Sequence, residues 1–271
     1  SNTTGSYNTA SGSFSLYSNT DGDNNTASGF YSLYSNTTGG QNTTYGFRSL
    51  YANTTGDYNI ASGYYSLHGN TTGSNNTAYG PFSLRYNTTG ARNIAIGYGT
   101  LDAPDTENDN LAIGYNALGG SIAGGEKNVA IGNYSLDAAT SGDNNTATGY
   151  DALTGTTTGA DNTALGYDAG DVITTGSQNV IIGSGSDPSA NSGANQIVIG
   201  YGATGHGDNI AVIGNGSATA IHPHDDGEVD LGSSSYEYKD LYVDGVAYMD
   251  AIGMGSTAMT LPTADGTANY V

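Results

Sequence analysis

Apolar and polar residues alternate over short stretches of this chain, and the same pattern returns with a period of about 17. With Asn8 counted as position 1, position 3 is small and position 9 is leucine through most of the chain. Alternation with a period of two indicates strands, so each repeat is expected to hold two short strands joined by turns, with positions 3 and 9 facing inward. The position 3 and position 9 residues are Ala10, Ala27, Thr44, Ala61, Ala78, Ala95, Ala112, Ala130, Ala147 and Ala164, and Leu16, Leu33, Leu50, Leu67, Leu84, Leu101, Leu118, Leu136 and Leu153.

Glycine at position 5 is the most regular feature of the repeat. It stands at Gly12, Gly29, Gly46, Gly63, Gly80, Gly97, Gly114, Gly132, Gly149, Gly166, Gly183 and Gly200, and the step to Gly132 is longer than the others by a single residue. The interval then shortens to 14 at Gly214. A fixed short period indicates one small unit stacked many times, which predicts an all-β solenoid of about 17-residue coils. About twelve coils spaced about 4.8 Å apart would form a rod of roughly 60 Å.

Glycine at two repeat positions is expected to allow a backbone conformation or a close approach that other residues would not. Glycine at position 5 lets the chain bend or lets another backbone come close. In the early repeats a second Asn at position 12 is followed three residues later by Gly, as in Asn19 and Gly22. This stretch is expected to be a turn in which the Asn side chain caps the backbone and the glycine supplies a positive φ.

Positions 2 and 4 form a second row on the opposite side of each strand. Thr9, Ser11, Thr26 and Ser28 make this row polar in the first repeats, whereas Ile and Val dominate it from Ile94 onward. A coil of this short length encloses little core, so the apolar row predicts an interface between copies of the chain. Closed cyclic symmetry with three chains is the simplest arrangement that buries such rows on one axis, so we expect a homotrimer.

Charge and composition limit the classes of molecule that the chain is expected to bind. The 271 residues include 25 Asp and Glu against 5 Lys and Arg, a formal charge of −20, which disfavours nucleic acid and anionic membranes. No apolar run is long enough to span a membrane, and no signal peptide is evident. Because the chain begins in the middle of a repeat, we expect it to be part of a longer protein. The repeat domain is assigned to residues 1–218, and residues 219–271 to a linker and C-terminal segment.

Several repeats resemble the heads of trimeric autotransporter adhesins. The stretches Asn93-Ile-Ala-Ile-Gly97, Asn128-Val-Ala-Ile-Gly132 and Asn179-Val-Ile-Ile-Gly183 match the Asn-x-Val/Ala-Ile-Gly phrase of those heads, and the resemblance covers about residues 8–216. It implies a left-handed parallel β-roll and a trimer. The repeat here is longer than the commonest spacing in that family, which implies larger outer loops. The Thr and Ser in the early repeats depart from the Ile and Val of the family.

The C-terminal segment resembles a different group of fibres. Residues 228–245 are similar to a segment found near the C-terminal ends of phage tail fibres and tailspikes, with Tyr238 where Trp is common. There it often precedes an intramolecular chaperone that aids trimerisation. Residues 261–266 are similar to linkers of the same proteins. This resemblance implies a short fibre-type module after the β-roll and favours a virion protein over a bacterial adhesin.

Aromatic rows supply the candidate ligand-binding residues. Tyr17, Tyr34 and Tyr51 occupy position 10 of successive repeats, while Phe14, Tyr31, Tyr65 and Phe82 occupy position 7. Such rows suit sugar rings, which have an apolar face and a polar edge. They are equally expected of side-chain ladders that stabilise a solenoid, and this structural interpretation is favoured.

Candidates for metal binding and modification also have a structural interpretation. His222 and His224 flank Pro223, and three chains could present six imidazoles to one axial metal; a polar linker is favoured instead. The acidic loops at residues 21–23 and 102–109 could hold calcium but lack the spacing of a known calcium loop. Asn-x-Thr sequons such as residues 36–38 are assigned to turns. No metal site and no cofactor is therefore expected.

The pattern contains no catalytic signature. There is no Cys, no nucleophile elbow and no P-loop. The many carboxylates lie in turns without a recurrent partner, so the sequence does not identify a catalytic pair among them. The sequence therefore predicts a structural, extracellular fibre protein that attaches to a cell-surface receptor, with a glycan as one candidate. The alternatives are a bacterial trimeric adhesin, a self-assembling extracellular filament and a glycan-cleaving tailspike.

Overall fold

A computed structural model describes residues 2–103, 106–120 and 125–218, together with residues 221, 235, 238, 242, 251–254 and 257–260. The chain divides into two compact units, residues 1–219 and 220–271. The first unit is a β-solenoid. In the second, the described strands β14 (Ala251–Met254) and β15 (Thr257–Thr260) pair antiparallel.

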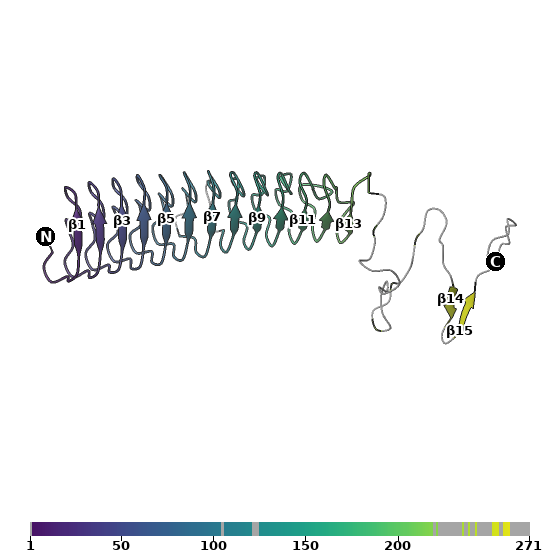
Figure 1. Ribbon diagram of the computed structural model, residues 1–271, viewed down its shortest axis with the longest axis horizontal. Helices are drawn as coiled ribbons and strands as arrows, with labels where there is room; N and C mark the ends of the chain where they lie inside the picture. Colours follow the sequence, from purple (N-terminus) through teal and green to yellow (C-terminus); the bar gives the residue numbers. More distant parts are fainter. Residues whose placement is uncertain are drawn as a thin grey trace. The chain divides into compact units, whose positions relative to one another are not determined.

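The solenoid is built on one parallel sheet of thirteen strands in sequence order, with neighbouring strands one repeat apart. In Figure 1 the strands form a row of parallel arrows, one for each coil. Each strand pairs with the next at the same repeat position, so that Ala78 lies opposite Ala95. The strands are β1 (Thr9–Ser11), β2 (Thr26–Ser28), β3 (Thr43–Tyr45), β4 (Ile60–Ser62), β5 (Thr77–Tyr79), β6 (Ile94–Ile96), β7 (Leu111–Ile113), β8 (Val129–Ile131), β9 (Thr146–Thr148), β10 (Thr163–Leu165), β11 (Val180–Ile182), β12 (Ile197–Ile199) and β13 (Ala211–Ile213).

Each coil has one strand, so the prediction of two strands per repeat was wrong. The segment around position 9 still bonds to its neighbour, because the Leu33 N–H donates to the Ser49 carbonyl at 3.0 Å. It is not extended, however, since Tyr31 and Leu33 at positions 7 and 9 have φ of 58° and 51°. These left-handed residues turn the chain back toward the strand, and a β-strand cannot include them.

The inward rows at positions 3 and 9 are confirmed. The alanines from Ala27 to Ala164 and the leucines from Leu33 to Leu153 are fully or almost fully buried. Position 8 joins them with small residues such as Ser66 and Ala152. The core is therefore a narrow stack of Leu, Ala and Ser columns, in which each coil covers the one before it.

Glycine at position 5 is required for both expected reasons. Gly46 has a φ of 124°, and a Cβ there would lie 2.6 Å from the carbonyl oxygen of Gly63 in the next coil. The turn glycines differ, because Gly39 has no positive φ; the left-handed residue is Gln41, with a φ of 59°. A Cβ on Gly39 would lie 2.5 Å from the Gly56 carbonyl oxygen, so close packing excludes a side chain there. The predicted role of positive φ in this turn was therefore wrong.

Two columns of buried Asn run through the interior, which the sequence pattern did not reveal. At position 1, the Asn59 carboxamide oxygen accepts the Asn76 N–H at 3.0 Å, and the Asn59 Nδ2 donates to the Gly73 carbonyl at 2.9 Å. At position 12, Asn36 Nδ2 donates to the Asn19 carboxamide oxygen at 2.7 Å. Each side chain thus satisfies backbone groups that no strand partner reaches, and it ties one coil to the next.

Candidate functional site

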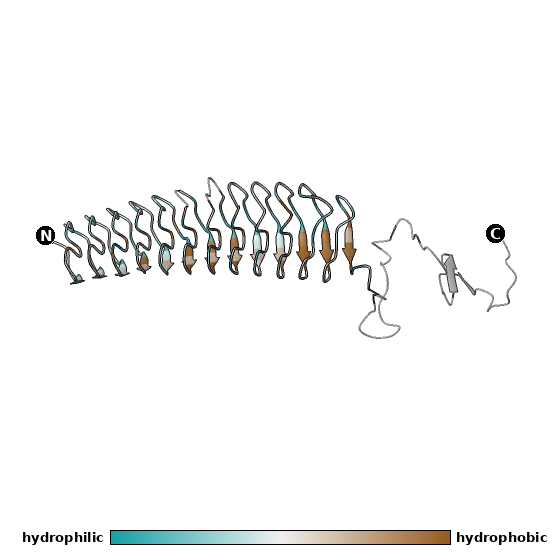
Figure 2. Ribbon diagram, turned by 90° about the horizontal axis from the view of Figure 1, so that it is seen from above, coloured by the Kyte–Doolittle hydropathy of each residue, from teal (hydrophilic) through white to brown (hydrophobic). Residues whose placement is uncertain are grey.

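The outer face of the sheet carries the apolar row predicted at positions 2 and 4. In most strands the central residue is buried while the two flanking side chains are wholly or partly exposed, as in β6, where Ile94 is 40% exposed and Ile96 38%. Figure 2 shows this outer row changing along the solenoid, with pale strands toward the N-terminus and brown ones at β11–β13. Thr146, Thr148 and Thr163 interrupt it. Its apolar members are Ile60, Ile94, Ile96, Leu111, Ile113, Val129, Ile131, Leu165, Val180, Ile182, Ile197, Ile199 and Ile213.

The three candidate tyrosines lie together in one ladder. The rings of Tyr17 and Tyr34 stack with centroids 5.3 Å apart, those of Tyr34 and Tyr51 are 5.2 Å apart, and His68 continues the row at 5.2 Å. Partial burial, followed by the charges of neighbouring tyrosines, raises the pKa of Tyr34. Both faces of Tyr34 and Tyr51 are covered by neighbouring rings. A sugar could therefore meet only their edges and hydroxyls, which leaves them better placed for stacking than for binding.

A second aromatic row at position 6 was missed in the sequence, although the repeat spacing alone would have shown it. Phe30 and Phe47 stack at 5.7 Å, Phe47 and Tyr64 at 5.4 Å, and Tyr98 and Tyr115 at 5.3 Å. Except for Phe47, its members are exposed. The complete row is Phe30, Phe47, Tyr64, Tyr98, Tyr115, Tyr150, Tyr167 and Tyr201. It gives the solenoid a long exposed aromatic edge.

Two arginines replace aromatic residues in the ladders. Arg48 stands at position 7, and its guanidinium carbon lies 5.3–5.7 Å from the ring centroids of four aromatic residues. Arg85 stands at position 10, with its guanidinium carbon 4.7–5.5 Å from three rings. Both arginines approach Tyr65, whose hydroxyl accepts a hydrogen bond from Arg48 at 3.1 Å. The two cations are therefore held by the π faces of the ladder.

His68 lies between these arginines along the chain and carries no charge at neutral pH. Burial, followed by the charges of Arg48 and Arg85, lowers the pKa of His68 to about 4. Its Nε2 atom is buried and has no hydrogen-bond partner among the described residues. The only positive charges in this part of the ladder are therefore the two guanidinium groups.

Further along the solenoid, carboxyl groups occupy positions 7 and 10, and Asp187 stands at position 9. Burial raises the pKa of Asp137, and burial followed by the charges of Asp168 and Asp171 raises that of Asp151. The pKa of Asp187 is raised to about 6 by burial and then by the charge and hydrogen bond of Asp171. Burial and the neighbouring negative charge of Asp171 thus favour the neutral form of Asp187.

The acidic turns near the N-terminus act as backbone caps. The Asp57 carboxylate accepts the Gly40 N–H at 2.7 Å, and the Asp23 carboxylate accepts the Ser6 N–H at 2.5 Å. With Asp21, they line an open hollow of about 280 Å³. Among the described residues, no group of three or more His, Cys, Asp or Glu side chains is arranged to hold a metal ion. His222, His224 and Asp105 lie outside the described residues.

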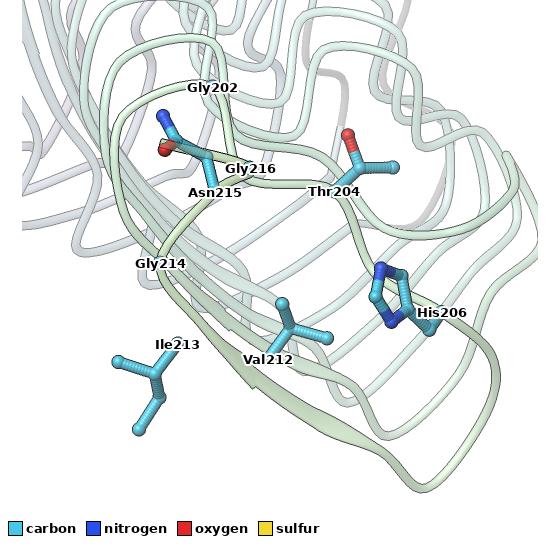
Figure 3. A pocket seen from close by; sticks show the side chains of 8 residues that line it. All are labelled: Gly202, Thr204, His206, Val212, Ile213, Gly214, Asn215 and Gly216. Carbon is cyan, nitrogen blue, oxygen red and sulfur yellow. The ribbon is translucent and has the colours of Figure 1, made fainter. Parts of the chain in front are cut away.

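A hollow of about 420 Å³ lies at β13, where the described coils end. Figure 3 shows Val212, Ile213 and His206 at its lower side, with Thr204, Asn215 and three glycines above them. Val212 corresponds to the inward alanines of earlier strands but is only half-buried, because no further described coil covers it. The hollow is thus the open end of the core.

No family model matches the chain, and comparisons with curated proteins and with solved structures found no match. The described residues include no helix long and apolar enough to cross a membrane. Function must therefore be inferred from the repeat, the apolar outer face and the cation-bearing aromatic ladder.

Proposed function

We propose that the chain is a structural segment of a homotrimeric extracellular fibre of the phage tail-fibre type, in which three left-handed β-rolls pack through their outer sheet faces. The observation that carries this proposal is the exposed Ile, Leu and Val row on β6–β8 and β10–β13. Water-exposed apolar rows of this length are unfavourable on an isolated chain, and they mark association surfaces. Cyclic symmetry places the same row of each chain against its copies.

Attachment to a cell-surface receptor follows from the same proposal. A stiff repeat rod with short strands and long turns holds those turns away from the surface that anchors it. Residues 219–271 would form the fibre-type C-terminal module; most of the segment 228–245 that suggests it lies outside the described residues. Labelling native virions or cells with an antibody against β1–β5 tests location. Label on a bacterial surface instead of virions would favour the adhesin alternative.

The oligomeric state is tested by changing the outer face. Ile96→Asp combined with Ile131→Asp places charges on that face at positions 38% and 37% exposed in the single chain. Tyr58→Asp combined with Val172→Asp makes a matched change at exposed sites outside the strands. Sedimentation equilibrium should give three times the 27.4 kDa chain mass for the parent and the control, and a single-chain mass for the isoleucine variant.

Two results would refute this assembly. A parent protein that sediments as a single chain at micromolar concentration excludes a stable trimer. A trimeric isoleucine variant excludes this face as the interface. Growth into long polymers as concentration rises would favour the self-assembling filament instead.

A catalytic role is not part of the proposal. Asp187, whose pKa is raised to about 6 by burial and then by the charge of Asp171, is with Asp171 the acidic pair that a test for glycan cleavage addresses. Incubation with host polysaccharide and measurement of reducing ends tests this. Release of sugar that stops in an Asp171→Asn variant would support the tailspike alternative.

A further inference from the structure

The two ladder arginines are unusual because the chain offers them many carboxylates and they bind none. The sequence contains 25 Asp and Glu but only 5 Lys and Arg. Among the described residues the one ion pair joins Arg92 to Asp109, at 2.6 Å. Arg48 and Arg85 lie two coils apart on one aromatic face, and neither makes an ion pair within the described part of the chain. Neither guanidinium group therefore has a carboxylate at ion-pair distance among the described residues.

Most N–H donors of these two guanidinium groups also lack an acceptor among the described residues. The one hydrogen bond that Arg48 makes to a described residue is to the Tyr65 hydroxyl, and Arg48 Nε is buried without a partner there. No described group accepts a hydrogen bond from Arg85. A guanidinium presents five N–H donors in a planar fork, so the donors other than the buried Arg48 Nε and the one bonded to Tyr65 are left for a ligand or for water.

The surrounding charges only partly offset those of Arg48 and Arg85. His68 is neutral at neutral pH, for the reasons given above. Asp102 stands at the position of Arg85 in the next coil. Burial raises its pKa and the charge of Arg85 lowers it, so this carboxyl group partly offsets the charge of Arg85 without forming an ion pair with it. Charges more than about 8 Å apart in solvent are largely screened at physiological salt, which weakens the effect of distant carboxylates on these arginines. An anion can thus approach the two arginines despite the overall negative charge.

We propose that Arg48 and Arg85, with the exposed rings of Tyr64 and Tyr86 beside them, form a binding site for a linear polysaccharide that carries carboxylate groups. A planar guanidinium binds a carboxylate through two parallel hydrogen bonds. Exposed tyrosine edges supply apolar contact and a hydroxyl for the sugar ring. The inference rests on the proposed attachment function and names the ligand class for it.

The spacing of the arginines favours a polymer with its carboxylates on alternate sugars. Arg48 belongs to the coil of β3 and Arg85 to that of β5, so they lie about 9.6 Å apart along the stack at about 4.8 Å per coil. One sugar of an extended glycan advances the polymer by about the length of one coil. A glycan lying along the solenoid would therefore place every second sugar at an arginine.

Calorimetric titration of the full chain with hyaluronan hexasaccharide tests the site, because this glycan carries a carboxylate on alternate sugars. The carboxyl-reduced hexasaccharide is the ligand control. Arg48→Gln combined with Arg85→Gln should weaken binding by about tenfold or more, as expected when two charge-assisted pairs are lost. Arg92→Gln combined with Lys127→Gln removes the same charge elsewhere and should change affinity by less than about twofold. Arg85→Gln alone should lower affinity and breaks no hydrogen bond within the described chain, which covers the case in which the double variant misfolds.

Three outcomes would overturn the proposal: no binding of hexasaccharide to the parent protein, equal weakening in the two double variants, or equal binding of the carboxyl-reduced glycan. Sedimentation of the same samples separates this question from the assembly. A trimer that does not bind refutes the glycan site alone, and a single chain that binds refutes the trimer alone.

Discussion

Replacing Gly166 by alanine tests whether close stacking of glycines sets the distance between coils. Gly166 follows β10 and has a φ of 142°. A Cβ there would lie 2.6 Å from the Gly183 carbonyl oxygen, 2.7 Å from its carbonyl carbon and 2.9 Å from the Ser184 nitrogen. All three atoms are backbone of the next coil, so they can move only if that coil moves.

Two terms make up the expected loss of stability. A residue with a side chain in this region of φ costs about 1–3 kcal/mol, and forcing extra volume into a packed interior costs about 1–3 kcal/mol more. The free energy of unfolding should therefore fall by about 2–6 kcal/mol. Gly185 provides the control, because its φ is 61° and nothing lies within 4 Å of a Cβ there. Gly185→Ala incurs only the left-handed backbone term, about 1–2 kcal/mol.

Urea unfolding followed by circular dichroism measures both variants, and hydrogen exchange locates the damage. In a stack where each coil touches only its neighbours, faster exchange should be confined to the strands around β10 and β11 and absent at β2 and β3. Equal destabilisation by Gly166→Ala and Gly185→Ala would show that φ alone matters, and it would refute the argument from coil spacing.

Three further perturbations probe the interior and the ladder. Asn76→Ala leaves the buried Asn93 N–H and a turn carbonyl without partners, which should lower the free energy of unfolding in urea by about 2–6 kcal/mol; a change below about 1 kcal/mol would contradict the role of the Asn column. Leu84→Ala empties a fully buried position and should cost about 2–5 kcal/mol by calorimetry, whereas an unchanged melting temperature would mean that the core is not packed there. NMR titration should give His68 a pKa of about 4 rather than about 6.5, the value that would contradict its burial. Because the unfolded chain takes up this proton first, the contribution of His68 to stability is complete above about pH 6.5 and is lost as pH falls toward 4, and His68→Phe should remove that loss.

The repeat alone predicted the stacking and the direction of most side chains. Alternation identified Ala78 and its counterparts as inward residues, and it identified Ile94 and Ile96 as outward ones. It could not show that only three residues of each coil are extended. Left-handed φ at residues such as Leu33 and Tyr31 is uncommon for these side chains, and it is imposed here by the closure of the coil rather than by local preference.

The polar interior and the arginine site were beyond the sequence pattern. Asn at positions 1 and 12 is typical of turns, so its burial follows only when a coil on each side supplies backbone partners. Arg48 and Arg85 occupy different repeat positions two coils apart, and they become neighbours of Tyr65 only after stacking. The position 6 aromatic row could have been found from the spacing alone.

The Asn columns also bear on how the solenoid carries mechanical load. Hydrogen bonds between coils run along the stack, so tension on its ends acts on every coil boundary in series, and the weakest boundary opens first. Up to Asn87 each boundary is tied by both columns; the position 12 column stops there, and the Asn87 carboxamide oxygen has no described partner. The apolar outer face strengthens at Ile94, in the next coil. The first coils are thus tied by both Asn columns. In the later coils the position 1 column continues alone, and in the proposed trimer contact with the neighbouring chains adds to it.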